Sequence, residues 1–257
     1  MNQPWGSSDC DSSWPRAESF PTLVSGAVHV WSLSLQGRPE QIDAGLELLT
    51  EDERAQARRF VRPELTRRFV RRRASLRGLL ARYTSVRAEE LVFRQNAFGK
   101  PSVAAPLLAC GVRFNLSHSQ DLALVAVSNE DDLGVDIERV RPLADQESLS
   151  RRYFAPLEQE AISRQVASER VLAFFRIWTG KEAILKAFGV GLAGGLERAV
   201  IALSETPAED PQLAAIDPEF GLPQSWQLRA LHPAAGYMAT LAVRATTGKV
   251  HCWHWGD

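Results

Sequence analysis

The sequence has little of what marks a disulfide-rich, membrane-spanning or secreted protein. Its 257 residues include three cysteines, Cys10, Cys110 and Cys252, which lie far apart and form no CxxC pair. This spacing excludes a zinc finger and does not favour a disulfide framework, so we expect free thiols. No apolar run approaches the ~20 residues that a membrane-spanning helix needs. The N-terminus lacks the basic start and apolar core of a secretory signal, and we therefore expect the protein in the cytoplasm.

Neither sign of charge is in excess. The chain has 30 lysines and arginines against 31 aspartates and glutamates, a net charge of −1, so the whole molecule is not built to bind a polyanion. Apolar residues make up 45% of the chain, which is a globular composition. The length allows one large domain or two smaller ones.

The spacing of apolar residues predicts helices and strands in both halves of the chain, which favours an α+β fold. A capping box at Thr50 and Glu53 starts a helix, and Gly99 marks a turn before Pro101. Strands are expected at residues 25–35, 111–119, 121–128, 133–140, 198–205, 225–233 and 236–245, and helices around 50–60, 64–84, 155–165 and 168–189. We divide the chain into a flexible N-terminal leader (1–24), an α/β subdomain (25–140) and a second α/β subdomain (141–257).

Two carboxylates lie on one face of the strand LGVDIE, at residues 133–138. In a strand, Asp136 and Glu138 point one way while Val135 and Ile137 point the other. Like charges repel, and oxygen ligands of this kind suit a hard divalent ion such as Mg²⁺. The alternative is a half-buried strand whose polar face meets solvent.

The segment FNLSHS places Ser117 beside His118. Adjacent strand residues point apart and there is no G-x-S-x-G elbow, so a serine–histidine nucleophile is rejected. Both side chains can donate hydrogen bonds to a phosphate, and a turn with a satisfied histidine is the alternative.

Twelve arginines and one acid, Glu64, lie between Arg54 and Arg87. Such a block indicates an electropositive surface on which most side chains are solvated. Arg73 is different because it lies in the apolar stripe of its helix, where it needs a phosphate or a carboxylate. Nucleic-acid binding is a further alternative, which the net charge does not favour.

The stretch IWTGKEAILKAFGVGL places Trp178, Glu182 and Lys186 on one helix face. An exposed Glu–Lys pair is one interpretation. The helix is apolar over most of its circumference, however, so we expect it to be buried with partners for its charges. Glu182 would then be a third carboxylate beside the strand pair, while spacing assigns no role to Lys181.

Four stretches occur in order: FGKP, FNLSHS, GVDIE, and WTGKEAILK followed by GVGL. This ordered set resembles the Sfp-type 4′-phosphopantetheinyl transferases, over residues 50–243. The resemblance implies a monomer of two similar α/β subdomains related by a pseudo-twofold axis, with coenzyme A between them. It also implies transfer of phosphopantetheine to a serine of an apo acyl or peptidyl carrier protein, with release of 3′,5′-ADP. Neither a nucleic acid nor a membrane is an expected partner.

The resemblance further implies which residues act. Mg²⁺ would be bound by Asp136, Glu138 and Glu182. Catalysis would rest on Asp136, on Glu182 as the base for the carrier serine, and on Lys186, which would neutralise the pyrophosphate or protonate the departing ADP oxygen. Contacts to coenzyme A would come from Gly99, Lys100, Asn115, Ser117, His118, Asp136, Glu182 and Lys186. A Mg²⁺-dependent phosphohydrolase acting on coenzyme A or nucleotides is the alternative for the same residues.

One departure concerns the 3′-phosphate of coenzyme A. Glu53 and Gln56 stand where the family commonly has basic residues that meet this group. Arg54, Arg58 or Arg73 are the substitutes that we expect from the sequence.

Overall fold

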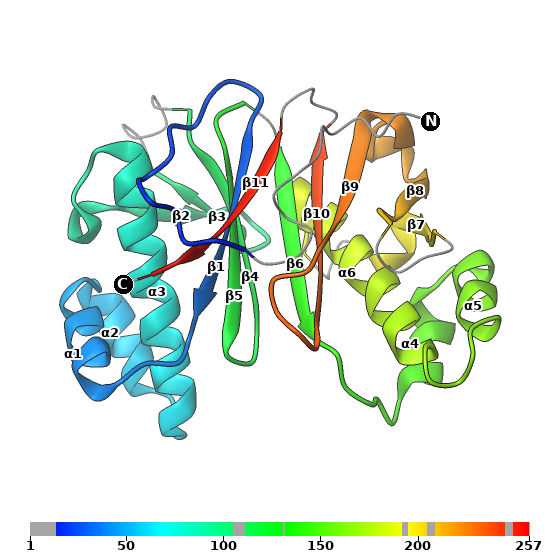
Figure 1. The fold of residues 1–257 in the computed structure, drawn as a ribbon, viewed down its shortest axis with the longest axis horizontal. Coiled ribbons are helices and arrows are strands. Elements are labelled where there is room, and N and C mark those ends of the chain that lie inside the picture. The colour runs from blue at the N-terminus through cyan, green and yellow to red at the C-terminus, as the bar shows by residue number, and fades with distance from the viewer. Residues whose placement is uncertain are drawn as a thin grey trace.

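Two β-sheets stand side by side at the centre of the molecule (Figure 1). The computed structural model describes residues 14–104, 111–130, 132–191, 195–204, 209–244 and 249–256. The first sheet has the strand order β11 (Val250–Trp255), β1 (Val28–Ser34), β5 (Leu122–Ser128) and β4 (Arg113–Ser119). The second has the order β6 (Leu133–Arg139), β10 (Tyr237–Arg244) and β9 (Trp226–Leu231).

Side chains of β4 join the two sheets. The backbone N–H of Val135 donates to Asn115 Oδ1 at 2.9 Å, and that of Ile137 donates to Ser117 Oγ at 3.4 Å. The backbone N–H of Arg139, two residues further along β6, donates to Ser119 Oγ at 3.1 Å. The polar residues of FNLSHS therefore take the place of a backbone partner for β6, which satisfies donors that would otherwise be orphaned at the sheet edge.

Helices α1 (Pro39–Glu47), α2 (Glu51–Arg58) and α3 (Pro63–Thr84) lie on the outer side of the first sheet (Figure 1). The predicted capping box is confirmed: Thr50 Oγ1 accepts from Glu53 N–H, and the Thr50 N–H donates to the Glu53 side chain. The apolar stripe of α3 packs on the sheet through Leu76, Leu79 and Leu80. Burial of this stripe is the main contribution that holds the helix in place.

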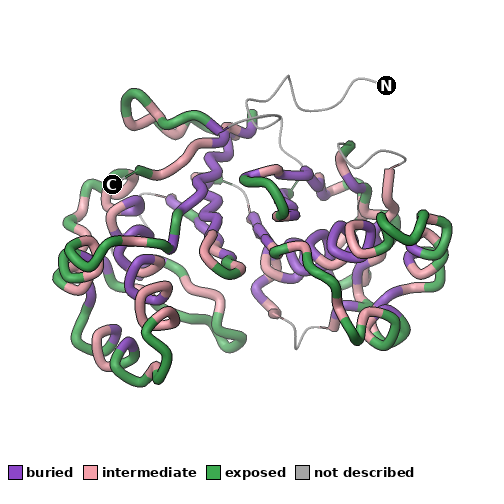
Figure 2. The backbone as a smooth tube through the Cα atoms, turned by 60° about the horizontal axis from the view of Figure 1, so that its bottom comes forward, coloured by how far each residue is buried: buried purple, intermediate pink, exposed green. Residues whose placement is uncertain are grey.

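Helices α4 (Gln146–Tyr153), α5 (Pro156–Ser163) and α6 (Arg170–Phe188) lie beside the second sheet. Two small hairpins and four short 3-10 helices complete the described elements: β2 (Phe93–Gln95) with β3 (Pro101–Val103), β7 (Ala199–Ala202) with β8 (Gln212–Ile216), and η1 (Ala88–Glu90), η4 (Leu196–Arg198), η5 (Pro218–Phe220) and η6 (Pro223–Ser225). As Figure 2 shows, buried backbone runs through the centre and exposed backbone gathers on the outer helices and loops.

Two glycines let α6 approach its neighbours closely. A Cβ on Gly134 of β6 would lie 2.1 Å from the carbonyl oxygen of Ala183, closer than real atoms approach. A Cβ on Gly180 would meet Ile201 of β7 at 3.2 Å, which accounts for a glycine in the middle of a helix. The Gly134 contact fixes α6 against β6, the strand that carries GVDIE.

Strand pairing crosses the predicted subdomain boundary. β6 ends before residue 140, yet it pairs antiparallel with β10 of the second sheet. β11 comes from the end of the chain but pairs parallel with β1 of the first sheet. The division at residue 140 therefore separates neither sheet cleanly, because sequence order does not reveal which strands pair over long distances.

The segment that we expected to be a flexible leader is partly packed in this structure. Residues 1–13 lie outside the described residues. Trp14 is only 4% exposed and belongs to the core, and the Phe20 ring stacks on Trp31 at 5.6 Å. The segment 14–24 therefore packs against the first sheet through Trp14 and Phe20.

The expectation of free thiols is wrong for Cys252. This residue is fully buried in β11 and is disulfide-bonded. Cys10 and Cys110 lie outside the described residues. A disulfide between cysteines far apart in sequence depends on the fold, which spacing cannot show. Among the residues described, no helix is both long enough and apolar enough to span a membrane.

Candidate active site

Three elements, β4, β6 and α6, bring the predicted catalytic residues together. Lys186 Nζ lies 2.5 Å from Asp136 Oδ1 and donates to Ser117 Oγ at 2.8 Å. The Ser117 hydroxyl in turn donates to Asp136 Oδ1 at 2.8 Å. Ser117 and Asp136 are buried, while the Lys186 side chain keeps 25% of its surface exposed. A charged cluster is thus held at the junction of the two sheets with one side open to a ligand.

Two further carboxylates lie within electrostatic reach of Asp136. Glu138 accepts a hydrogen bond from Ser119 Oγ at 2.7 Å. Burial raises the pKa of Glu138, and the charge of Asp136 raises it further. Burial and then the charge of Asp136 raise the pKa of Glu182 to about 7, with Glu138 adding to the effect and Lys186 opposing it. The three predicted carboxylates therefore lie close enough to influence one another's charge.

The donor chemistry of this cluster fits a hard divalent cation. Asp136 Oδ2 is buried and has no hydrogen-bond partner within the described residues. Repulsion among the carboxylates also favours a positive charge between them. As they stand, the acidic, histidine and cysteine side chains in the described part of the chain include no group of three arranged to hold a metal ion. Two features therefore suit a cation: the negative charge of the three carboxylates, and the buried oxygen Asp136 Oδ2, which has no hydrogen-bond partner within the described residues.

His118 lies on the other face of β4 from Ser117, as alternation along a strand requires. It lines a cavity of about 280 Å³ against α3, together with Arg68, Phe69 and Arg72. His118 is exposed at the rim of this cavity. Desolvation by the surrounding walls is the main cause that lowers the pKa of its ring to about 4, and the charge of Arg72 is the second contribution to this value.

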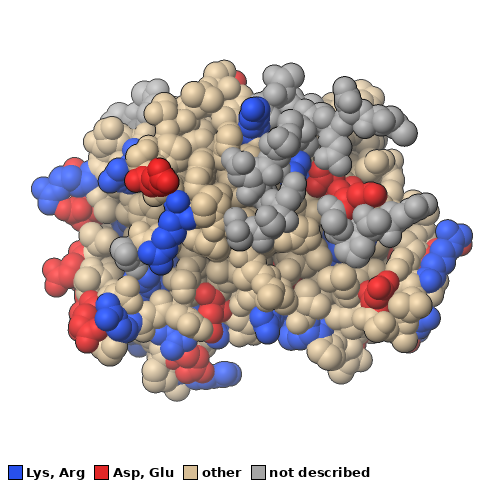
Figure 3. All heavy atoms as spheres, in the orientation of Figure 1, with Lys and Arg blue, Asp and Glu red and all other residues tan. Residues whose placement is uncertain are grey.

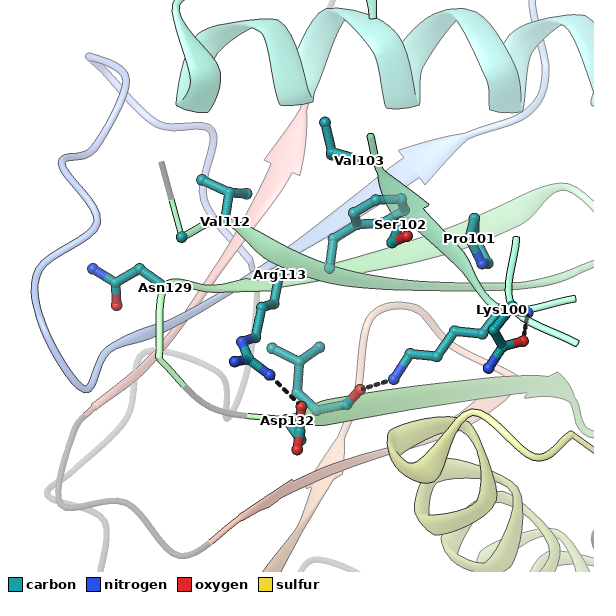
Figure 4. Close-up of a pocket in the computed structure, with 12 residues that line it drawn as sticks. Lys100, Pro101, Ser102, Val103, Val112, Arg113, Asn129 and Asp132 are labelled. Atoms are coloured by element: carbon teal, nitrogen blue, oxygen red, sulfur yellow. Dashed lines mark hydrogen bonds and ion pairs between the residues drawn. The ribbon is translucent and has the colours of Figure 1, made fainter. Parts of the chain in front are cut away.

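Lys100 lines a second cavity, of about 430 Å³, beside the starts of β4 and β6 (Figure 4), whereas Gly99 is not among the lining residues. Gly99 has a φ of +85° and closes the predicted turn with a hydrogen bond from its N–H to the Asn96 carbonyl. Lys100 Nζ donates to the carbonyls of Ala187, at 2.7 Å, and Leu133, at 3.4 Å. Burial lowers the pKa of Lys100 to about 8. In this structure the ammonium group ties the turn to the end of α6.

Comparison with known proteins shows to which family the chain belongs. Residues 35–130 match a family model described as 4′-phosphopantetheinyl transferase, N-terminal, and residues 132–242 match the 4′-phosphopantetheinyl transferase superfamily. The 4′-phosphopantetheinyl transferase HetI of Nostoc sp. is 38% identical over 91% of this chain and 94% of its own length. The chain belongs to the 4′-phosphopantetheinyl transferase family.

Two further members of the family are more distant. The 4′-phosphopantetheinyl transferase psf-1 of Bacillus pumilus is 28% identical over 88% of this chain and 91% of its own. The 4′-phosphopantetheinyl transferase Sfp of Bacillus subtilis is 25% identical over 60% of this chain and 66% of its own. The resemblance that the four ordered motifs predicted is thereby confirmed.

Several residues that we expected to contact coenzyme A form hydrogen bonds or ion pairs with other residues of the protein. Asn115 Oδ1 accepts from the Val135 N–H, which gives this side chain a structural part at the sheet junction. Arg73 Nε lies 3.2 Å from Glu53 Oε1, so its partner is a carboxylate. Arg54 and Arg58 both pair with Glu51 on the surface of α2. The three arginines expected to replace the missing basic residues are thus already paired.

Two charged residues have places that the sequence did not predict. Lys181 points away from Glu182 into the core, where its Nζ lies 2.8 Å from a carboxylate oxygen of Glu158. Arg72, inside the arginine block, lines the cavity beside His118. In the sequence, Lys181 and Arg72 resemble the charged residues next to them, and they differ only in the direction in which their side chains point. The spacing of residues along one helix does not predict which other element each side chain will contact.

Proposed function

We propose that this protein transfers the 4′-phosphopantetheine group from coenzyme A to a serine of an apo acyl or peptidyl carrier protein, releasing 3′,5′-ADP. The observation that carries this proposal is the Lys186–Asp136–Ser117 cluster, with Glu138 and Glu182 beside it. Family membership supports the same reaction. Nothing in the comparisons favours the phosphohydrolase alternative.

The cluster provides charges of both signs for this chemistry. Breaking the pyrophosphate leaves negative charge on the departing 3′,5′-ADP, which the Lys186 ammonium can stabilise and protonate. The carrier serine must lose a proton, and the Glu182 carboxylate beside Asp136 and Lys186 is the candidate to accept it. Asp136 positions Lys186 through their short contact.

Mg²⁺ is proposed as the cation of this site. Asp136, Glu138 and Glu182 would hold it, and the free Asp136 Oδ2 offers one oxygen for the purpose. When bound, the ion would supply positive charge to the pyrophosphate.

We also propose that the two halves are related by a pseudo-twofold axis. In support, each sheet packs against one long helix, α3 on the first and α6 on the second. The sheets meet at β4 and β6, where coenzyme A would bind between the halves. A monomeric state and a cytoplasmic location stay predictions.

A role in nucleic-acid binding has little support. On the face shown in Figure 3, positive and negative side chains are intermingled around the periphery. Within the arginine block, Arg54, Arg58, Arg67, Arg68, Arg73 and Arg77 pair with carboxylates.

A carrier-modification assay tests the proposed function. The protein is incubated with coenzyme A, Mg²⁺ and each of several apo carrier proteins, and the carriers are weighed by mass spectrometry. We expect a gain of one phosphopantetheine, loss of activity with EDTA, and recovery with added Mg²⁺. Absence of any gain across fatty-acid, polyketide and peptide carriers would overturn the proposal, and release of 3′,5′-ADP without a carrier would favour hydrolysis.

Variants of the carboxylates test the assigned roles. Asp136→Asn and Glu182→Gln each remove one negative charge with little change in shape. We expect both to lower the transfer rate by about 100-fold or more, the size of effect that loss of a general base or a key charge produces. Circular dichroism should show a folded protein in each case, and near-normal activity of either variant would contradict its role.

A further inference from the structure

The polar residues of β4 meet β6 in a repeating arrangement. Asn115, Ser117 and Ser119 are alternate residues of β4, and each accepts a hydrogen bond from a backbone N–H of β6. The two serines also donate to carboxylates of β6. Ser117 donates to Asp136 Oδ1 at 2.8 Å. Ser119 donates to Glu138 Oε2 at 2.7 Å. Each serine hydroxyl therefore connects the backbone of β6 with one carboxylate of the proposed metal site.

The direction of both hydrogen bonds at Ser119 is fixed by chemistry. The Arg139 N–H can only donate, so Ser119 Oγ accepts from it at 3.1 Å. An ionised carboxylate can only accept, and the single proton of the hydroxyl therefore goes to Glu138 Oε2. Because the backbones of β4 and β6 hold the Ser119 oxygen in place, one oxygen of Glu138 is anchored to the junction of the two sheets.

Glu138 relies on this hydrogen bond more than its neighbour on β6 does. Asp136 Oδ1 is held by both Ser117 and Lys186, whereas Ser119 is the one hydrogen-bond donor to Glu138 among the residues that the structure describes. The Glu138 side chain is only partly buried, and the negative charge of Asp136 acts on it. Without Ser119, this repulsion and the rotatable bonds of a glutamate would turn the carboxylate toward solvent.

We propose that Ser119 is a positioning residue of the metal site, whose hydroxyl holds Glu138 Oε2 and leaves Oε1 available to the divalent ion. The inference rests on the proposed function and deepens it. Within the described part of the chain, Oε1 takes part in no hydrogen bond or ion pair, which agrees with an oxygen kept for a ligand. A hydrogen-bond partner behind a metal ligand orients that ligand and typically contributes about 10- to 100-fold to metal affinity.

Ser119 can be tested separately from the reacting groups, whereas Ser117 cannot. Lys186 Nζ donates to Ser117 Oγ at 2.8 Å, so a change at Ser117 disturbs Lys186 and Asp136 together. In the described residues, the Ser119 hydroxyl bonds only to the Arg139 N–H and to Glu138. Its removal therefore changes the orientation of a single carboxylate.

Metal binding without turnover tests the proposal. Mn²⁺ serves as the hard divalent probe, and its free concentration is measured by electron paramagnetic resonance with coenzyme A present and no carrier protein. We expect Ser119→Ala to weaken Mn²⁺ binding by about tenfold, and Ser119→Thr, which keeps the hydroxyl, to stay within about threefold of the native protein. Ser34→Ala, at an exposed serine of β1 in the same sheet, is the control and should change binding by less than about twofold.

A double-mutant cycle shows whether Ser119 acts through Glu138. Glu138→Ala removes the carboxylate and should itself weaken Mn²⁺ binding by about tenfold or more. If Ser119 positions that carboxylate, adding Ser119→Ala to Glu138→Ala should cause no further loss. A further loss as large as the one in the native background would show that Ser119 acts on the sheet junction, and would overturn the proposal.

The transfer reaction gives a second measurement. Ser119→Ala should raise the Mg²⁺ concentration for half-maximal rate by about tenfold, while the rate at saturating Mg²⁺ falls by less than about threefold. A general weakening of the fold would instead lower the saturated rate and leave the Mg²⁺ dependence unchanged. Arg139 is exposed, so water can accept from its N–H in the variant, and circular dichroism should show a folded protein. Ser119→Cys, whose thiol is a weak donor, is a second variant and should show a smaller loss of the same kind.

The outcomes distinguish the positioning role from the proposed function. Native Mn²⁺ affinity in Ser119→Ala, or an equally large loss in Ser119→Thr, would overturn the positioning role, and so would a native protein that binds no Mn²⁺. Failure to modify any carrier, with the expected pattern of Mn²⁺ affinities intact, would overturn the proposed function alone.

Discussion

At the scale of single residues, His29 is a histidine that folding keeps neutral. It lies in β1 with 2% of its surface exposed, and its Nδ1 is 2.8 Å from the hydroxyl of Tyr83. Burial lowers the pKa of His29 to about 4, and the nearby His251 contributes in the same direction. Because the folded pKa lies below the unfolded value near 6.5, stability is complete above pH 6.5 and is lost as the pH falls toward 4.

We therefore expect His29 to account for about 2–3 kcal/mol of acid destabilisation, since one pKa unit is worth about 1.4 kcal/mol. The free energy of unfolding in urea is measured at pH 7.5 and pH 4.5 for the native protein and for His29→Gln. The variant should lose about 2–3 kcal/mol less between the two pH values. Equal losses would show that His29 is not buried in its neutral form.

The same scale shows which site residues a sequence can predict. Asp136 and Glu138 share a strand face, and Glu182 and Lys186 share a helix face, so two short-range periodicities predict most of the charged cluster. The sequence predicts that Arg73 pairs with a phosphate or a carboxylate. In the structure its partner is the carboxylate of Glu53. Arg72 gave no such signal, because its direction depends on where α3 packs.

At the scale of elements, a buried ion pair connects α5, α6 and β7. Lys181 Nζ lies 2.8 Å from Glu158 Oε2, and both side chains are completely buried. Lys181 also donates to the carbonyls of Leu196 and Ala199, while Glu158 accepts from the N–H groups of Ile201 and Ala155. These bonds fix the rotation of α6 about its axis, and so the direction in which Glu182 points.

Lys181→Met should destabilise the protein by about 3–5 kcal/mol, because it leaves the Glu158 carboxylate buried without its counter-charge. Urea unfolding measures this loss directly. Lys249→Met, at an exposed lysine, serves as the matched control and should change stability by no more than about 0.5 kcal/mol. A Lys181→Met protein as stable as the control would show that the pair contributes little.

The sequence predicts the positions of strands that alternate regularly between apolar and polar residues, but it does not predict which strands pair with one another. The strands β4, β5 and β6 lie where the sequence pattern placed them. The strand β11, with the sequence VHCWHW, was missed because it mixes apolar and polar residues without a clear period. Its place was set by pairing with β1, more than 200 residues earlier in the chain.

At the scale of the whole molecule, the two ends of the described chain close one sheet together. β11 pairs parallel with β1 from Val28 to Leu33, and the Trp31 and Trp253 rings stack at 5.0 Å. Pro15 accepts a hydrogen bond from the His254 N–H at 2.8 Å. The first sheet therefore cannot be completed until the last strand is present, although its other strands come from the first half of the chain.

Removal of β11 should then destabilise the first half of the molecule more than the second. A chain that ends at Arg244 exposes the backbone edge of β1 and the apolar faces of Trp31 and Phe20. We expect loss of a single cooperative thermal transition and self-association, because an unpaired apolar edge strand promotes aggregation. Circular dichroism melting and size-exclusion chromatography measure these effects, and removal of residues 256 and 257 alone is the control. If the shortened chain stayed monomeric and melted at the native temperature, β11 would have no part in holding the first sheet together.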